Sequence, residues 1–91
     1  MADDQVQTQS AKLGPDYWLT VTRTEEPTEW IVRILGPSPT VRTVQAETEE
    51  DAQAVAVEVA VEYFRENAID TDIPDALHWT AATRLSFRVL L

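Results

Sequence analysis

The sequence predicts an α+β fold of two layers, in which an antiparallel sheet carries one long helix across one of its faces. Three observations predict it. One stretch, residues 48–69, combines a helix start signal with a helix-forming composition. Three short stretches of strand-like alternation precede it, and a fourth closes the chain. The predicted order β-β-β-α-β gives two layers, because a sheet with one apolar face must bury that face against another element.

The chain of 91 residues is long enough for one domain with a modest core. Residues 1–15 are polar and have little to bury, which predicts a disordered N-terminal tail followed by a single α+β domain over residues 16–91. The first residues lack the basic and apolar segments of a signal peptide, and no apolar run approaches the roughly 18–20 residues that cross a bilayer. These features predict a cytoplasmic protein that does not enter a membrane.

The strand-forming stretches before the helix are short and closely spaced. Residues 17–24 are YWLTVTRT, residues 30–35 are WIVRIL and residues 40–46 are TVRTVQA. All three are rich in aromatic and β-branched side chains. Pro27 and the GPSP run at 36–39 mark turns between them. Strands joined by such short connections can pair only as antiparallel hairpins.

The predicted helix begins at Thr48, which occupies an N-cap position. Three acidic residues follow it in the first turn, where free N–H groups and the helix dipole favour negative charge. Asp51 stands three residues after Thr48, as in a short-armed capping box. The valines at alternate positions from 55 to 61 allow a rival interpretation as a strand. The cap, the acidic turn and the length favour the helix.

The surface of this helix is apolar over about twice the arc that an ordinary surface helix buries. One apolar stripe contains Ala52, Ala56, Val59 and Tyr63, and a second contains Val57, Ala60, Val61, Phe64 and Ala68. The sheet of one small domain can cover only one stripe, so the other is available to another element or to a second copy. We expect a homodimer interface to repeat Val57, Val61 and Phe64 across a two-fold axis.

The C-terminal stretch is the second predicted interface. Residues 70–83 form a connection, and residues 84–91 are RLSFRVLL, which alternates as a half-buried strand does. A strand at the end of a chain must pair to be ordered, either with its own sheet or with that of a neighbour. Phe87, Val89 and Leu91 are therefore added to the predicted interface residues.

Sixteen carboxylates against seven Lys and Arg give a net charge of −9. Strong binding to nucleic acid is not expected, because affinity for phosphate comes from clustered cationic side chains. The acidity has two interpretations, a composition that favours solubility or an acidic face that docks on a basic partner and mimics nucleic acid. The sheet face away from the helix is predicted to carry Arg33 and Arg42, with Trp18 either stacking on a base or packing in an interface.

Catalytic chemistry has little support in the sequence. The chain has no cysteine, which excludes a thiolate nucleophile, a disulfide and a cysteine metal site. His78 is the only histidine, and Asp75 is its only local carboxylate. Asp70, Asp72 and Asp75 lack the glycine and the final glutamate of a calcium loop, and helix termination explains them. We therefore predict that the protein is not an enzyme and has no catalytic residue, cofactor or metal site.

The layout before and into the helix resembles that of known three-strand-plus-helix modules. A tryptophan-containing strand over 30–35, a second strand over 41–46 and the TEEDA sequence at 48–52 are similar in arrangement to HicB-type antitoxins and to the arm-binding domains of tyrosine integrases. The resemblance covers residues 29–64. It implies the order of strands and helix and assigns no functional residue.

Two functions follow as hypotheses. The first is a non-catalytic protein-interaction or regulatory module that self-associates as a homodimer through its helix or its C-terminal strand, with a further protein partner that is basic. The second is a regulator of nucleic-acid transactions. It would act as an acidic inhibitor that mimics nucleic acid, or as a weak nucleic-acid binder through the arginine-bearing sheet face.

Overall fold

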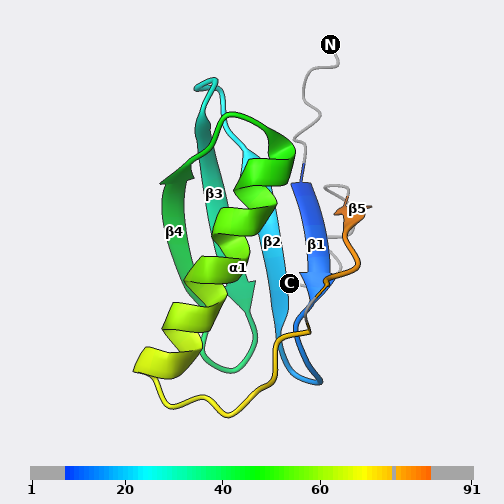
Figure 1. Cartoon of the computed structure of the whole chain (residues 1–91), viewed down its shortest axis with the longest axis vertical. Coiled ribbons are helices and arrows are strands. Elements are labelled where there is room, and N and C mark those ends of the chain that lie inside the picture. Colours follow the sequence, from blue (N-terminus) through cyan, green and yellow to red (C-terminus); the bar gives the residue numbers. More distant parts are fainter. Residues whose placement is uncertain (1–7, 75, 83–91) are drawn as a thin grey trace.

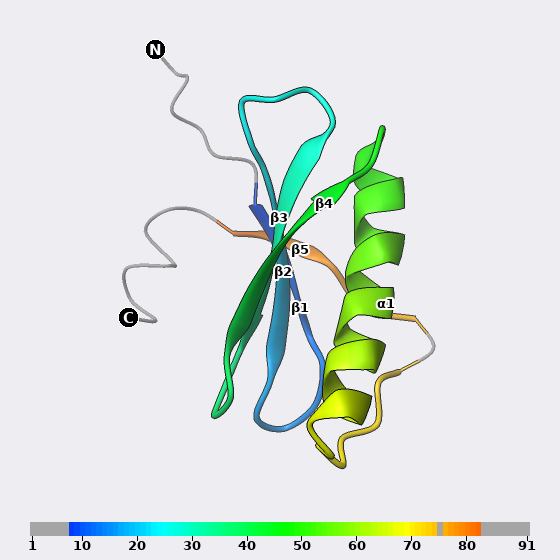
Figure 2. The ribbon, with the colours of Figure 1, turned by 90° about the vertical axis from the view of Figure 1, so that its left-hand side faces the viewer.

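One helix lies across one face of a five-stranded antiparallel sheet in the computed structural model, which describes residues 8–74 and 76–82 (Figures 1 and 2). The elements are β1 (Thr8–Lys12), β2 (Trp18–Arg23), β3 (Glu29–Leu35), β4 (Thr40–Gln45), α1 (Glu49–Glu66) and β5 (Thr80–Ala82). The strand order across the sheet is β4-β3-β2-β1-β5. The predicted α+β class is confirmed, with one more strand before the helix than the sequence predicts.

The additional strand is β1, which lies where the sequence predicts a disordered tail. β1 pairs antiparallel with β2 on one side and with β5 on the other. Ala11 and Leu13 are each 1% exposed, and burial of their apolar surface offsets the entropy lost on ordering the segment. The predicted tail is therefore wrong for residues 8–15, and residues 1–7 lie outside the described part of the chain.

β5 falls within the connection predicted over residues 70–83. Its three residues pair with β1, with Ser10 opposite Thr80 and Thr8 opposite Ala82. The strand predicted over residues 84–91 lies outside the described residues. The same holds for the interface residues predicted there, which are Phe87, Val89 and Leu91.

The core lies between α1 and the middle of the sheet. Leu19 is paired with Ile34 and Val21 with Val32, so that four fully buried side chains from β2 and β3 form one apolar patch. The indole of Trp30 is also buried, and its Nε1 donates a hydrogen bond to the carbonyl oxygen of Ala46 at 3.0 Å.

α1 contacts this patch through a ridge of four residues, Ala52, Ala56, Ala60 and Phe64. They recur every fourth position, so they lie above one another on one side of the helix. Phe64 is 4% exposed, and its ring centroid is 4.9 Å from that of Tyr17. Two residues of the ridge belong to the first predicted stripe and two to the second. Neither predicted stripe therefore faces the sheet as a whole.

The two ends of α1 are defined by backbone and side-chain hydrogen bonds. Thr48 is the N-cap, as predicted, and its Oγ1 accepts a hydrogen bond from the Asp51 N–H at 3.1 Å. The helix ends three residues before the predicted position 69, in a Schellman motif. Ile69 N–H donates to the Phe64 carbonyl at 2.8 Å, and Ala68 adopts a left-handed φ of 54°, the conformation that glycine normally supplies.

Replacing Ala68→Gly should raise the free energy of unfolding by about 1 kcal/mol, measured by urea denaturation. The left-handed conformation strains a side-chain-bearing residue by roughly 1–2 kcal/mol, and the exposed Ala68 methyl group loses little packing. The matched control is Ala54→Gly, at an exposed position inside α1, which should lower the stability by about 1 kcal/mol. A loss of stability in Ala68→Gly would contradict the assignment.

Candidate functional site

Three large hydrophobic side chains are exposed in the described part of the chain, and each lies on a different element. Trp18 of β2 is 39% exposed, Val41 of β4 is 57% exposed and Val61 of α1 is 37% exposed. None of the three belongs to the ridge or patch of the core. They mark three candidate surfaces, which are the outer side of α1, the outer face of the sheet and the β4 edge.

The outer side of α1 retains only part of the predicted interface. Val61 is exposed, as a contact residue must be. Val57 is half-buried and packs against the core. Phe64 is buried beneath the helix against Tyr17, so its assignment to an interface is wrong. The reason is that every fourth residue of the helix faces the sheet, and Phe64 is the fourth residue after the buried Ala60.

A depression of about 410 Å³ lies along this outer side, lined by Val55, Val57, Glu58, Val59, Val61, Glu62 and Arg65. Its volume is in the range of small-molecule pockets, but such pockets enclose most of their ligand between opposing walls. Every lining residue here belongs to α1, so no second element closes over the depression. The spacing along the helix places Glu58, Glu62 and Arg65 in its middle, with Val57 and Val61 on one side and Val55 and Val59 on the other. The arrangement suits contact with the surface of another macromolecule.

The register of the sheet separates the two arginines that the sequence places on one face. Residues directly opposite each other on antiparallel strands point to the same face. Arg33 is opposite Thr20 and Val41, whereas Arg42 is opposite Val32, whose side chain is in the core. Arg42 therefore lies on the α1 side and Arg33 on the other. The predicted face with both arginines is wrong.

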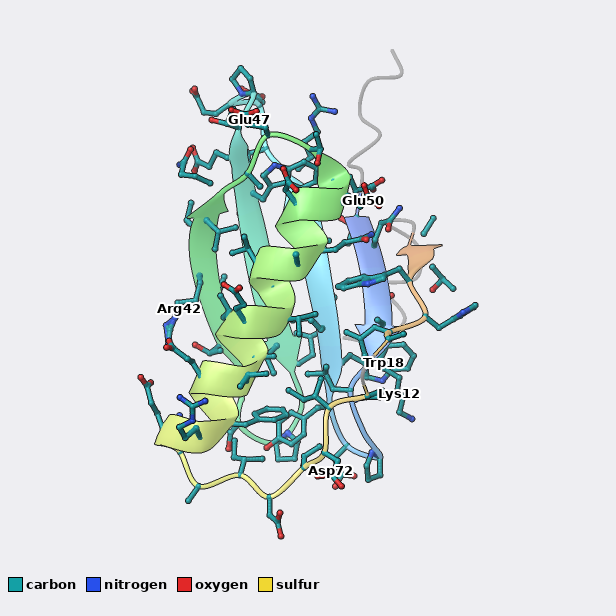
Figure 3. The ribbon with its side chains drawn as sticks, viewed as in Figure 1. Lys12, Trp18, Arg42, Glu47, Glu50 and Asp72 are labelled. Atoms are coloured by element: carbon teal, nitrogen blue, oxygen red, sulfur yellow. The ribbon has the colours of Figure 1, made fainter. Side chains whose placement is uncertain are left out.

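Trp18 lies on the outer face of the sheet, as predicted, with Lys12 opposite it on β1 (Figure 3). The ammonium nitrogen of Lys12 is 5.4 Å from the centroid of the Trp18 ring, within the range of a cation–π contact. The lysine therefore already interacts with the aromatic ring that the sequence suggests for base stacking.

A group of threonines on the same outer face has no counterpart in the sequence-based predictions of a site. Thr8 and Thr22 are buried, and their Oγ1 atoms form a hydrogen bond of 3.0 Å. Thr20, next along β2 on this face, is 1% exposed, and its Oγ1 has no hydrogen-bond partner within the described structure. Threonine alternation in a strand is common, so no local signal distinguishes Thr20 from its neighbours.

Charge is divided between the two layers of the fold. Nine carboxylates and a single arginine lie between positions 47 and 72, whereas the rest of the chain is close to neutral. Figure 3 shows Glu47, Glu50 and Asp72 spread along the helical layer from one end to the other. Most of the carboxylates of the chain therefore gather in the helical layer.

The residues weighed for chemistry do not form a site. His78, Asp70 and Asp72 are exposed, and Asp75 lies outside the described residues. Among residues 8–74 and 76–82, no three side chains of the metal-binding types are grouped to hold an ion. The helix in this part of the chain is also too polar to cross a membrane.

Replacing Thr20→Val should leave the free energy of unfolding unchanged or raise it by up to about 1 kcal/mol, because an unpaired buried hydroxyl costs roughly 1–3 kcal/mol. Thr22→Val is the matched control. It removes the hydrogen bond to Thr8 and should lower the stability by about 1–2 kcal/mol. Equal destabilisation of the two variants in thermal or urea unfolding would show that the Thr20 hydroxyl has a partner.

Comparisons with known proteins identify no relative of this chain. No protein-family model matches it, and neither a curated protein nor a solved structure gives a significant match. The resemblance to HicB-type antitoxins and integrase arm-binding domains stays a prediction.

Proposed function

We propose that this protein is a non-catalytic interaction module that binds a basic protein surface through the outer side of α1. The observation that supports the proposal is the exposed Val61 beside the strip of Glu58, Glu62 and Arg65, which has a net negative charge, along the α1 depression. Apolar contact supplies affinity when water leaves the valines, and the carboxylates select a partner of opposite charge. The depression is too open to enclose a small substrate.

The same charges argue against homodimerisation through this surface. A two-fold axis repeats the same patch on both copies, so two patches that each have two carboxylates and one guanidinium would face each other. Their net charges have the same sign, which disfavours the contact. We therefore propose that the chain self-associates through a surface other than α1, and that α1 binds a basic partner.

A short amphipathic peptide of lysine and leucine tests the proposal, with affinity measured by fluorescence anisotropy. Removing both charges in Glu58→Gln/Glu62→Gln should weaken binding roughly three- to tenfold, since an exposed ion pair contributes about 0.2–1 kcal/mol. Val61→Ser should weaken binding at low and high salt alike, because the contribution of Val61 is apolar.

The matched control is Glu25→Gln/Glu26→Gln, which removes two charges from the β2–β3 turn. Equal losses in the two double variants would contradict the proposal.

The second candidate function, regulation of nucleic-acid transactions, is favoured only in its acidic form. The helical layer concentrates most of the net charge, which suits a basic protein that otherwise holds nucleic acid. Direct binding loses its basis, because Arg33 and Arg42 lie on opposite faces. We expect no gel shift with single- or double-stranded DNA even at low salt. A shift that weakens steeply with salt would restore the direct-binding hypothesis.

A further inference from the structure

β4 is an open edge of the sheet in the described structure. It pairs with β3 on one side, and no described strand lies on its other side. A strand at an edge presents a row of unpaired N–H and C=O groups to any strand that can approach. Val41, the most exposed of the three large hydrophobic side chains, is part of it.

This edge has one of the features with which proteins protect their edge strands and lacks the others. Protection comes from very short strands, prolines, charged side chains, above all lysines and charges that point inward, or bulges. Arg42, on the α1 side of the sheet, is such an inward-pointing charge. β4 has six residues, TVRTVQ, with no proline or lysine among them, and it pairs with β3 in an uninterrupted register. β5, at the opposite edge, has three residues in the described part of the chain. The contrast makes β4 the better template for another strand.

We propose that β4 pairs with β4 of a second copy across a two-fold axis, which joins the two sheets into one. An identical strand is an antiparallel partner by symmetry, and the axis then stands perpendicular to the sheet. Both helices lie on the same side of the joined sheet. Tyr63, near the end of α1, donates a hydrogen bond to the Ser38 carbonyl just before β4 begins. The helix C-terminal ends therefore lie at opposite ends of the joined strands, which leaves room for both.

The residues of β4 select the register in which Thr43 lies on the axis. An axis at Arg42 places two guanidinium groups opposite each other, and like charges in that position are destabilising. An axis at Val41 requires pairing by Pro39, which has no N–H. An axis at Val44 places Arg42 opposite Ala46, which lies beyond the end of β4, so fewer residues of the strand are paired. With Thr43 on the axis, residues 41–45 pair without any of these obstacles.

Charge also favours this surface for self-association over the outer side of α1. Arg42 is the only charged residue of β4, and it points to the same side of the sheet as the acidic helix layer. In the joined sheet the two Arg42 side chains lie beside the axis, between two layers of like negative charge. Their positive charges reduce the repulsion between the two acidic layers, whereas contact between the two α1 helices would increase it. The inference does not rest on the basic partner proposed for α1.

The absence of cysteine from the chain makes the register directly testable. In Thr43→Cys, the two introduced residues face each other with Cα atoms about 4.5–5.5 Å apart, within the range of about 4.4–6.8 Å that a disulfide spans. Mild oxidation of the full chain should therefore trap a covalent dimer. Arg42→Cys is the matched control and should not cross-link, because its two copies lie diagonally, roughly 8 Å apart.

A charge substitution tests the same surface without a cross-link. Sedimentation velocity of the wild type should show a dimer that dissociates on dilution, and Thr43→Lys should raise its dissociation constant about tenfold or more, since two ammonium groups meet at the axis. Val61→Lys introduces the same charge on α1 and should leave the dimer unchanged. Circular dichroism of each variant verifies that it folds.

Three results would overturn the inference. They are a wild type that is monomeric at every concentration, a dimer that Val61→Lys dissociates and Thr43→Lys does not, and a cross-link in Arg42→Cys in place of Thr43→Cys. The first and third leave the basic partner at α1 untouched, because the peptide titration measures it separately. The second would show α1 to be the homodimer surface and would contradict both proposals.

Discussion

The close approach of α1 to the sheet is the constraint on which the rest of the structure depends. Ala52, Ala56 and Ala60 carry no side chain beyond Cβ, so the helix rests directly on the apolar patch of β2 and β3. Contact so narrow leaves little volume in the middle of the core. Bulky side chains fill its two ends instead, Trp30 beside the start of the helix and Phe64 against Tyr17 at its end.

The narrow ridge also explains the surface of the helix. Only one residue in four faces the sheet fully, so the valines of α1 lie on its flanks and its outer side. Those on the flanks are half-buried, and Val61 remains exposed. The carboxylates occupy what is left, which makes the layer acidic on its outside. An exposed valine beside a strip of charged residues with a net negative charge therefore follows from the way in which the helix packs, and it is the basis of the proposed preference for basic partners.

The order of the strands in the sheet determines which backbone hydrogen-bonding groups are paired. β1 lies between β2 and β5, so a segment of low β-propensity gains partners on both sides. The β2-β3-β4 meander runs in the opposite direction across the sheet and ends at β4. α1 makes most of its contacts with β2 and fewer with β3 and β4. Within residues 8–74 and 76–82, no strand pairs with the outer side of β4, and we propose that this edge pairs with a copy of itself.

The sequence by itself determined the features that depend on local chemistry. The Thr48 cap, the turn at 36–39 and the strands over 17–24 and 30–35 were predictable, because their signals lie in neighbouring residues or in a clear alternation of apolar and polar side chains. Only the tertiary structure decided β1, whose order comes from its neighbours. It also decided on which face of the sheet Arg42 lies. Both sides of β4 mix valine with polar residues, so only the pairing with β3 determines which side faces α1. The sheet-facing side of α1 was undetermined for a similar reason. A helix that is apolar over most of its surface is oriented by how closely its backbone can approach the sheet, and the alanines allow the closest approach.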